Sequence, residues 1–203
     1  ALAQRDIKRM LAYSSIENVG IITLGLGVGL LGQSLERPAV AFFGYAGALA
    51  HVLNHGLMKG LLFQAAGSVL HATGTRTIDA LGALLGKMPA TGRAFLVGAV
   101  AICGLPPLNG FAGEWLIYLG AFRGSATLPT GWAIVSLVVI PVLALVGGLA
   151  AACFVRAFGV VFLGTARTAA AATAHEAGPA MRGAMLVGAV LCIGLGLLPA
   201  GLV

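Results

Sequence analysis

The chain has 203 residues, of which 59% are hydrophobic and 9% are charged, and its mean hydropathy is +1.01. Soluble domains average about 45–50% apolar and roughly 25% charged residues, so this composition excludes an ordinary soluble domain and indicates a membrane protein. The net charge of +6 comes from only 12 Lys and Arg residues, which are scattered at the ends of apolar blocks. This distribution argues against a nucleic-acid-binding face, and the hydrophobicity argues against disorder.

The first two apolar blocks are each long enough to cross a bilayer, which requires about 20 helical residues. The first spans about Met10 to Leu31, after a polar stretch at residues 4–9 that is typical of a loop between two spans. The second runs from Ala39 to about Ala72 without a proline. At about 1.5 Å per residue it would reach roughly 51 Å, enough to cross while tilted and to project from one face.

The third block, from Ala94 to Phe122, is interrupted at residues 104–110. Pro106 and Pro107 remove backbone donors there, and Asn109 and Gly110 follow them, so the helix must break. A single broken crossing places nine basic residues on one face and two, at positions 37 and 123, on the other. Two complete crossings would give seven against four, so the excess of Lys and Arg on the cytoplasmic side favours one discontinuous helix.

The remaining blocks predict a fourth span from about Trp132 to Leu163 and a fifth from Met181 to about Val203. The fold class is therefore all-α: a polytopic transmembrane helix bundle of about five spans in a single domain of residues 1–203, with a cytoplasmic start. The opening loop indicates a piece of a longer protein. Residues 169–174 and the following His175 and Glu176 are interpreted as a low-complexity loop without an assigned function.

Three cysteines stand alone inside apolar runs, at positions 103, 153 and 192. They form no Cys-x-x-Cys motif and support neither a disulfide framework nor a metal cluster. We interpret them as packing residues.

The second block carries the most informative polar residues. His51, His55 and Lys59 follow one another at spacings of four residues, which puts them on one helix face, with Asn54 beside them. An ionisable group near the bilayer centre is costly and is by default a functional hypothesis. Imidazole titrates near neutrality and burial favours the neutral form of lysine, so a proton relay is one interpretation. The alternatives are hydrogen bonding between helices and, less favoured because no third ligand stands at the right spacing, a metal site.

Four further ionisable residues are candidates. Glu114 follows the interruption of the third block, where unwound backbone at membrane depth lines a cavity or is buried, and a carboxylate there can take up and release a proton. Glu17 is close to the basic end of the first span and is equally compatible with a capped or exposed acid. His71, near the end of the second block, is compatible with a solvated terminus or a site of proton uptake. Arg156 is expected to extend its side chain toward the membrane surface, and the alternative is that it faces the hydrated interior.

Four segments resemble one known family, namely residues 4–20, 51–63, 105–115 and 151–159. They are similar to the proton-conducting, antiporter-like subunits of respiratory complex I, Mrp cation antiporters and membrane-bound hydrogenases. The Asn54-His55 pair and the Pro-Pro-Leu-Asn-Gly-Phe segment most resemble the hydrogenase 4 component B and formate hydrogenlyase type. The resemblance implies that this chain corresponds to the last helices of a larger subunit built from two inverted repeats.

The resemblance also implies roles and partners. Lys59 would be the lysine on the helix before the broken one, His55 its neighbour on that helix, and Glu114 the terminal ionisable residue of the path. The chain would be a non-redox membrane subunit of an oxidoreductase complex in the bacterial cytoplasmic membrane. It would hold no cofactor itself, and iron–sulfur clusters with nickel–iron or flavin would lie in a peripheral redox arm and partner subunits. The alternatives are an Mrp-type antiporter subunit that exchanges sodium or potassium for protons and a structural membrane subunit without transport.

Overall fold

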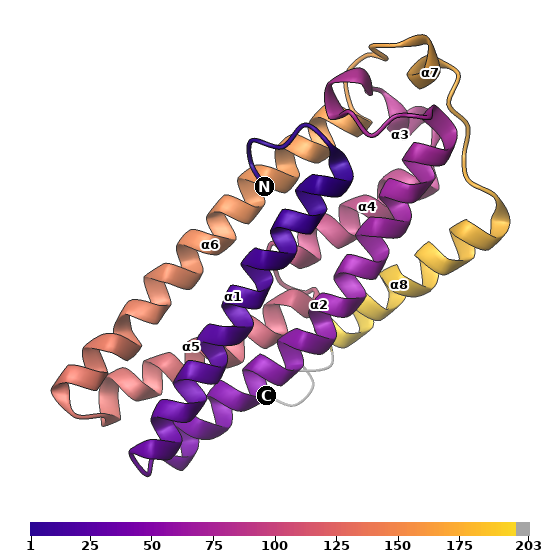
Figure 1. Ribbon diagram of the computed structural model, residues 1–203. Helices are drawn as coiled ribbons and strands as arrows, with labels where there is room; N and C mark the ends of the chain where they lie inside the picture. The colour runs from indigo at the N-terminus through magenta and orange to yellow at the C-terminus, as the bar shows by residue number, and fades with distance from the viewer. Residues whose placement is uncertain (198–203) are drawn as a thin grey trace.

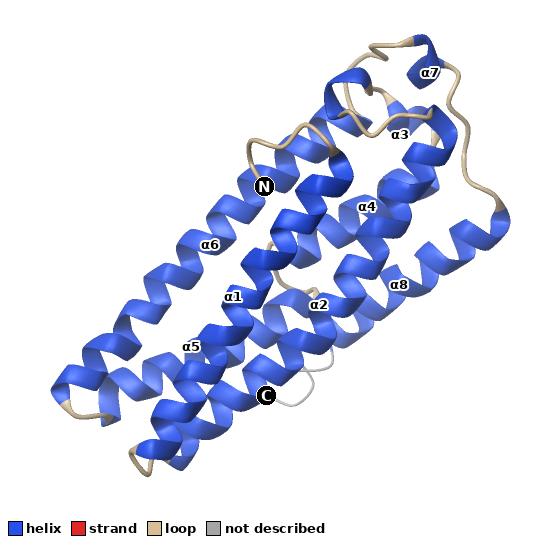
Figure 2. Cartoon of the chain, viewed as in Figure 1, coloured by secondary structure: helices blue, strands red, loops and turns tan. Residues whose placement is uncertain are grey.

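The computed structural model describes residues 1–197, which form helices joined by short connections and contain no strand (Figure 2). The helices are α1 (Ile7–Ser34), α2 (Pro38–Thr73), η1 (Ile78–Ala80), α3 (Leu84–Lys87), α4 (Pro89–Ile102), α5 (Asn109–Thr127), α6 (Thr130–Phe162), α7 (Ala169–Ala172) and α8 (Pro179–Leu197). By length and composition, α1, α6 and α8 could each cross a membrane, and α4 is a shorter apolar helix. The predicted all-α membrane bundle is confirmed. The end of the predicted fifth span, residues 198–203, lies outside the described residues.

The broken helix is formed by α4 and α5, which follow one another along the bundle in the same direction (Figure 1). The chain leaves α4 after Ile102, passes Gly104 in the left-handed region at φ +64°, and re-enters a helix at Asn109. Gly110 allows the two halves to meet, because a Cβ there would lie 1.9 Å from the Ala101 carbonyl oxygen. The prediction of one discontinuous helix, interrupted around the two prolines, is confirmed.

Two helices begin before the predicted apolar blocks, and one segment predicted as loop forms a helical turn. The start of α1 is Ile7, not Met10, because the Asp6 carboxylate accepts hydrogen bonds from the backbone N–H groups of Lys8 and Arg9 at 2.9 and 3.0 Å. The start of α4 is Pro89, not Ala94, since proline suits the first turn of a helix. Residues 169–172, interpreted as loop, form the single turn α7 behind a capping threonine, Thr168.

Helices α1 and α2 share the most extensive contact between helices of the described residues, and they pack through glycines. A Cβ on Gly44 would lie 2.3 Å from the backbone nitrogen of Gly29, and one on Gly32 would lie 2.3 Å from that of Ala41. Small residues at such spacings let transmembrane helices approach to backbone contact. This contact fixes the register between α1 and α2, and therefore which polar residues of the two helices face each other.

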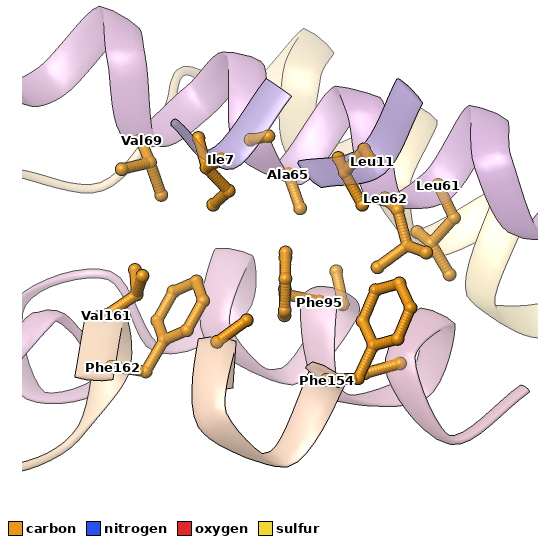
Figure 3. Packing of buried hydrophobic residues seen from close by; sticks show 14 of the residues in the cluster. Ile7, Leu11, Leu61, Leu62, Ala65, Val69, Phe95, Phe154, Val161 and Phe162 are labelled. Carbon is orange, nitrogen blue, oxygen red and sulfur yellow. The ribbon is translucent and has the colours of Figure 1, made fainter. Parts of the chain in front are cut away.

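Apolar side chains form two separate clusters along the bundle. The larger joins α1, α2, α4 and α6 near the end that carries the chain start; Figure 3 shows Ile7, Leu11 and Leu62 facing Phe95, Phe154 and Phe162. The smaller, which includes Ile21, Val28 and Ile117, lies toward the other end. Between them α1, α2 and α5 carry buried polar residues, which we call the polar layer: Ser14, Asn18, His51, Asn54, Lys59, Asn109 and Glu114.

Connections that are far apart in sequence meet at one end of the bundle. Residue 78 donates its backbone N–H to the Arg5 carbonyl at 2.8 Å, and Ala83 donates to the Leu163 carbonyl at 2.9 Å. Arg76 also pairs with Asp6 at 3.2 Å. The opposite end carries the α1–α2 and α5–α6 turns (Figure 1). The segments that hold most of the basic residues thus gather at a single end, as a single broken crossing requires.

Candidate functional site

Lys59 occupies the centre of α2 and is only 7% exposed. It lies 14 residues before the end of the helix, a distance of about 21 Å at 1.5 Å per residue, so its side chain cannot reach the end of α2. Its ammonium group donates hydrogen bonds to the Leu11 carbonyl oxygen at 2.5 Å and to the Ser14 hydroxyl. Both acceptors belong to α1 and both are neutral.

A carboxylate lies near this lysine without forming an ion pair. Glu17 follows Ser14 by one helical turn, so it lies on the same side of α1 as the hydroxyl that accepts from Lys59, and it is partly buried. Within residues 1–197 the ion pairs are Arg5–Asp79 and Arg76–Asp6, both at the end of the bundle. Glu17 therefore joins the polar layer, and neither it nor Glu114 is locked to the lysine by a direct contact.

His51 is fully buried where α2 meets both α1 and α5. Its Nε2 atom forms a hydrogen bond of 3.1 Å with the Asn18 side-chain oxygen, while its Nδ1 atom has no protein partner. A Cβ on Gly113 would lie 3.0 Å from the His51 backbone, so α5 contacts α2 closely here. The residue before Glu114 thus brings α5 against the polar face of α2.

Asn54 connects α2 to the start of the second half of the broken helix. Its side-chain amide donates to the Asn109 carbonyl oxygen at 2.8 Å, and the Asn109 amide donates back to the Asn54 side-chain oxygen at 3.3 Å. Asn109 is the first residue of α5, and its carbonyl oxygen has two lone pairs, so it can accept from Asn54 in addition to a bond within the helix. The pair fixes the position of α5 relative to the lysine-bearing helix.

Glu114 lies one turn into α5 and is 7% exposed. Its carboxylate folds back against the interruption, because a Cβ on Gly104 would lie 2.5 Å from Glu114 Oε2. Gly104 therefore serves two purposes: it adopts the left-handed turn and leaves room for the carboxylate. Pro106 and Pro107 lie in the same interruption, on its exposed side.

The two remaining histidines differ in their placement. His55 is partly buried on the same face of α2, and its Nε2 atom is buried with no hydrogen-bond partner in the part of the chain that the structure describes. His71 is exposed in the last turn of α2, 12 residues and about 18 Å from Lys59. The structure therefore brings Lys59, His55, His51, Glu17 and Glu114 into or beside the polar layer and leaves His71 outside it.

Some partners in the site were not identified from the sequence. Ser14 and Asn18 are the direct partners of Lys59 and His51, and only their spacing of four residues on a helix hinted at a shared face. The sequence marked Gly104 only as a glycine close to the two prolines, and nothing in it indicated that Gly104 contacts the Glu114 carboxylate. Arg156, predicted to reach toward the membrane surface, is exposed and donates to the Leu2 carbonyl.

Glu176, to which the sequence assigned no role, caps α4. Its carboxylate accepts from the Ala90 backbone N–H at 2.7 Å and from the Thr91 hydroxyl at 2.6 Å. Burial alone would raise the pKa of this carboxyl, but these hydrogen bonds outweigh burial and lower the pKa below its usual value. The contact joins residues 86 positions apart, which no local pattern could predict.

Residues 1–141 match the family model described as NADH:quinone oxidoreductase/Mrp antiporter, TM. The chain belongs to this family of membrane subunits. It is 44% identical over 193 residues to hydrogenase-4 component B of Escherichia coli (strain K12) and 45% identical over 197 residues to formate hydrogenlyase subunit 3 of the same strain. Each alignment covers 95% of this chain but only 29% and 32% of the relative, so the chain spans about a third of these proteins.

A solved structure of the membrane-bound sulfane sulfur reductase, an archaeal respiratory membrane complex, contains a similar chain. The two superpose with a TM-score of 0.76 at 28% identity, covering 97% of this chain and 29% of that one. The predicted resemblance to antiporter-like subunits of respiratory and hydrogenase complexes is confirmed.

Proposed function

We propose that this chain is part of a proton-translocating subunit of a membrane-bound hydrogenase or complex-I-like complex, with Lys59, His55, His51, Glu17 and Glu114 along the proton path. The observation that carries the proposal is the polar layer itself. Ionisable residues of three helices meet between two apolar clusters, and the lysine is hydrogen-bonded only to neutral acceptors. Groups of this kind are costly in a membrane and are retained where charge must move.

Several buried polar atoms in and beside the polar layer lack hydrogen-bond partners within the described part of the chain, and this feature supports the proposed proton path. His51 Nδ1, His55 Nε2 and Asn109 Oδ1 are buried and have no hydrogen-bond partner among residues 1–197. Buried polar atoms of this kind are positions where water molecules join a hydrogen-bonded chain. Glu17 lies one helical turn from Ser14, the hydroxyl partner of Lys59, so a proton gained or lost at the carboxylate would act on the lysine through its charge.

The proposal includes partners and location. The relatives are named as subunits of hydrogenase 4 and formate hydrogenlyase, so we place this chain among other membrane subunits and a peripheral arm that holds the redox cofactors. We place the complex in a bacterial cytoplasmic membrane. The chain would supply proton transfer and no electron transfer.

Replacing Glu114 by Gln in the full-length complex tests the proposal, because Gln keeps the size of the side chain and removes its ability to exchange a proton. A positioned acid–base group contributes about 10²–10⁴-fold to proton transfer, so we expect coupled proton uptake in sealed vesicles to fall by about 10² or more, and Glu114→Asp to retain more activity. Glu36→Gln is the matched control, since Glu36 is exposed in the α1–α2 turn. Equal uptake in Glu114→Gln and the control, with normal assembly, would disprove the role of Glu114.

The Mrp-type alternative gives a different result in the same vesicles. Exchange of sodium or potassium would make proton uptake depend on the cation supplied. The polar layer combines a lysine and imidazoles with the carboxylates, and hard cations prefer all-oxygen ligands, so we expect uptake to be independent of sodium and potassium.

A further inference from the structure

A cleft of about 200 Å³ lies between α4 and α8, near the end of the bundle where the basic connections gather. Arg93 of α4 and Arg182 of α8 line it, together with Ala90 and a set of apolar side chains from the same two helices: Ala94, Val97, Met185, Leu186 and Ala189. None of these residues belongs to the polar layer described above.

The two arginines are not paired with protein groups. Both side chains are exposed, and within residues 1–197 neither takes part in an ion pair or a side-chain hydrogen bond. Two guanidinium groups lining one small cleft repel each other, and an anion between them removes this repulsion. Guanidinium binds phosphate oxygens through paired N–H donors, so a phosphate group matches this pair.

One acidic residue also lies near the cleft. Glu176 accepts a hydrogen bond from Ala90, which is among the lining residues, but its carboxylate is already bound by the backbone and hydroxyl donors at the start of α4. The charge of the two arginines and this carboxylate together is positive. The cleft therefore still favours an anionic group.

The order of polar and apolar groups along the cleft matches the order within a phospholipid. Arg93 comes four residues after the start of α4 and Arg182 three residues after the start of α8, so both lie within about 6 Å of the ends of their helices. The apolar residues follow further into each helix. A charged group would lie at the membrane surface and hydrocarbon would lie below it. Basic clefts of this form between transmembrane helices bind anionic lipid headgroups.

We propose that this cleft binds one anionic phospholipid, with its phosphate between Arg93 and Arg182 and the upper part of an acyl chain along Val97 and Leu186. The bound lipid would join α8 to α4, the first half of the broken helix. A soluble phosphate compound could bind the two arginines, but it would leave the apolar lining of the cleft without a partner. The proposal is therefore a lipid site, independent of the proton path.

The test is a lipid titration of the purified, delipidated full complex, followed by native mass spectrometry. Phosphatidylglycerol and phosphatidylethanolamine with identical acyl chains are the two probes, and cardiolipin is a third. Each arginine near an anionic lipid contributes about 1 kcal/mol, which is about fivefold in affinity, so we expect the double variant Arg93→Gln, Arg182→Gln to bind phosphatidylglycerol about thirtyfold more weakly. The control is Arg37→Gln, Arg123→Gln, which makes the same charge change outside the cleft and should bind like the wild type.

A second variant tests whether the apolar lining of the cleft contributes to lipid binding. Ala189→Phe fills the cleft below the arginines, so we expect it to weaken phosphatidylglycerol binding while both arginines remain. Glycerol phosphate, which has the anion without the acyl chains, should compete only at concentrations far above those of the lipid. Equal affinity of the Arg93, Arg182 variant and its control, equal binding of the two lipids, or competition by glycerol phosphate at lipid concentrations would each overturn the proposal.

Discussion

Lys59 provides the sharpest test, because the structure separates its contribution to stability from its contribution to proton transfer. Lys59→Met keeps much of the side-chain length and removes the charge. It removes the donors to Leu11 and Ser14, but the Leu11 carbonyl still accepts from the Ser14 hydroxyl at 3.0 Å, so no buried donor is left unpaired. A lost hydrogen bond costs about 1 kcal/mol and removing a buried charge recovers a similar amount, so we expect the free energy of unfolding to change by less than about 1–2 kcal/mol.

Lys59→Arg makes the complementary change. Arginine keeps a charge that is not released in proteins, and it adds volume at a position that is 7% exposed. We expect a loss of about 1–3 kcal/mol in stability from overpacking. A lysine that gains and loses a proton cannot be replaced by either residue, whereas a lysine that acts only as a fixed positive charge beside Glu17 can be replaced by arginine.

The assay is proton uptake coupled to electron transfer in sealed vesicles that carry the full complex, with assembly measured separately by the abundance of the intact complex. We expect both variants to assemble and both to lose coupled uptake. Wild-type uptake in Lys59→Arg would refute the switching of charge, and wild-type uptake in Lys59→Met would refute any role in the path. Failure of Lys59→Met to assemble would refute the stability argument drawn from its contacts.

Three further variants test other parts of the structure. Gly104→Ala places a methyl group 2.5 Å from Glu114 Oε2 at a φ of +64°, so we expect about 1–2 kcal/mol of destabilisation and reduced proton uptake; unchanged values in both measurements would contradict the geometry. Glu176→Gln weakens the cap of α4 and should cost about 1 kcal/mol at neutral pH. Because the folded pKa lies below the usual one, this stabilisation is complete above about pH 4.3 and disappears as the pH falls through the folded value, so thermal unfolding of wild type and variant should converge in acid. Single cysteines at Thr75 and Ser125 should react with an impermeant thiol reagent from opposite sides of the membrane, and labelling from the same side would disprove a single broken crossing.

The helices could be predicted from sequence because their signals are local. Long apolar blocks, two adjacent prolines and charge-rich connections gave the number and order of the main elements, including the interruption between α4 and α5. The spacing of His51, His55 and Lys59 correctly placed these residues on one face of α2, the face that meets α1 and α5. These features depend on residues at most a few turns apart.

The contacts between helices could not be predicted in this way. The pairing of Lys59 with Ser14 depends on the register of α1 against α2, which is fixed by the approach of Gly44 to Gly29. That register is a property of two surfaces, and no spacing within one helix contains it. The cap on α4 is similar, since its carboxylate comes from Glu176, far along the chain.

The interruption in the helix explains how the polar layer can contain Glu114 and Lys59 without an ion pair between them. The second half of the broken helix restarts at Asn109, whose carbonyl oxygen and side-chain amide both pair with the Asn54 side chain, and this pairing holds α5 at a set position against α2. Glu114 is then turned toward Gly104, not toward the lysine. A direct ion pair would stabilise both charged forms and oppose any change in protonation. Within residues 1–197 neither Glu17 nor Glu114 forms an ion pair with the lysine, so each group stays able to gain or lose a proton, as the proposed path requires.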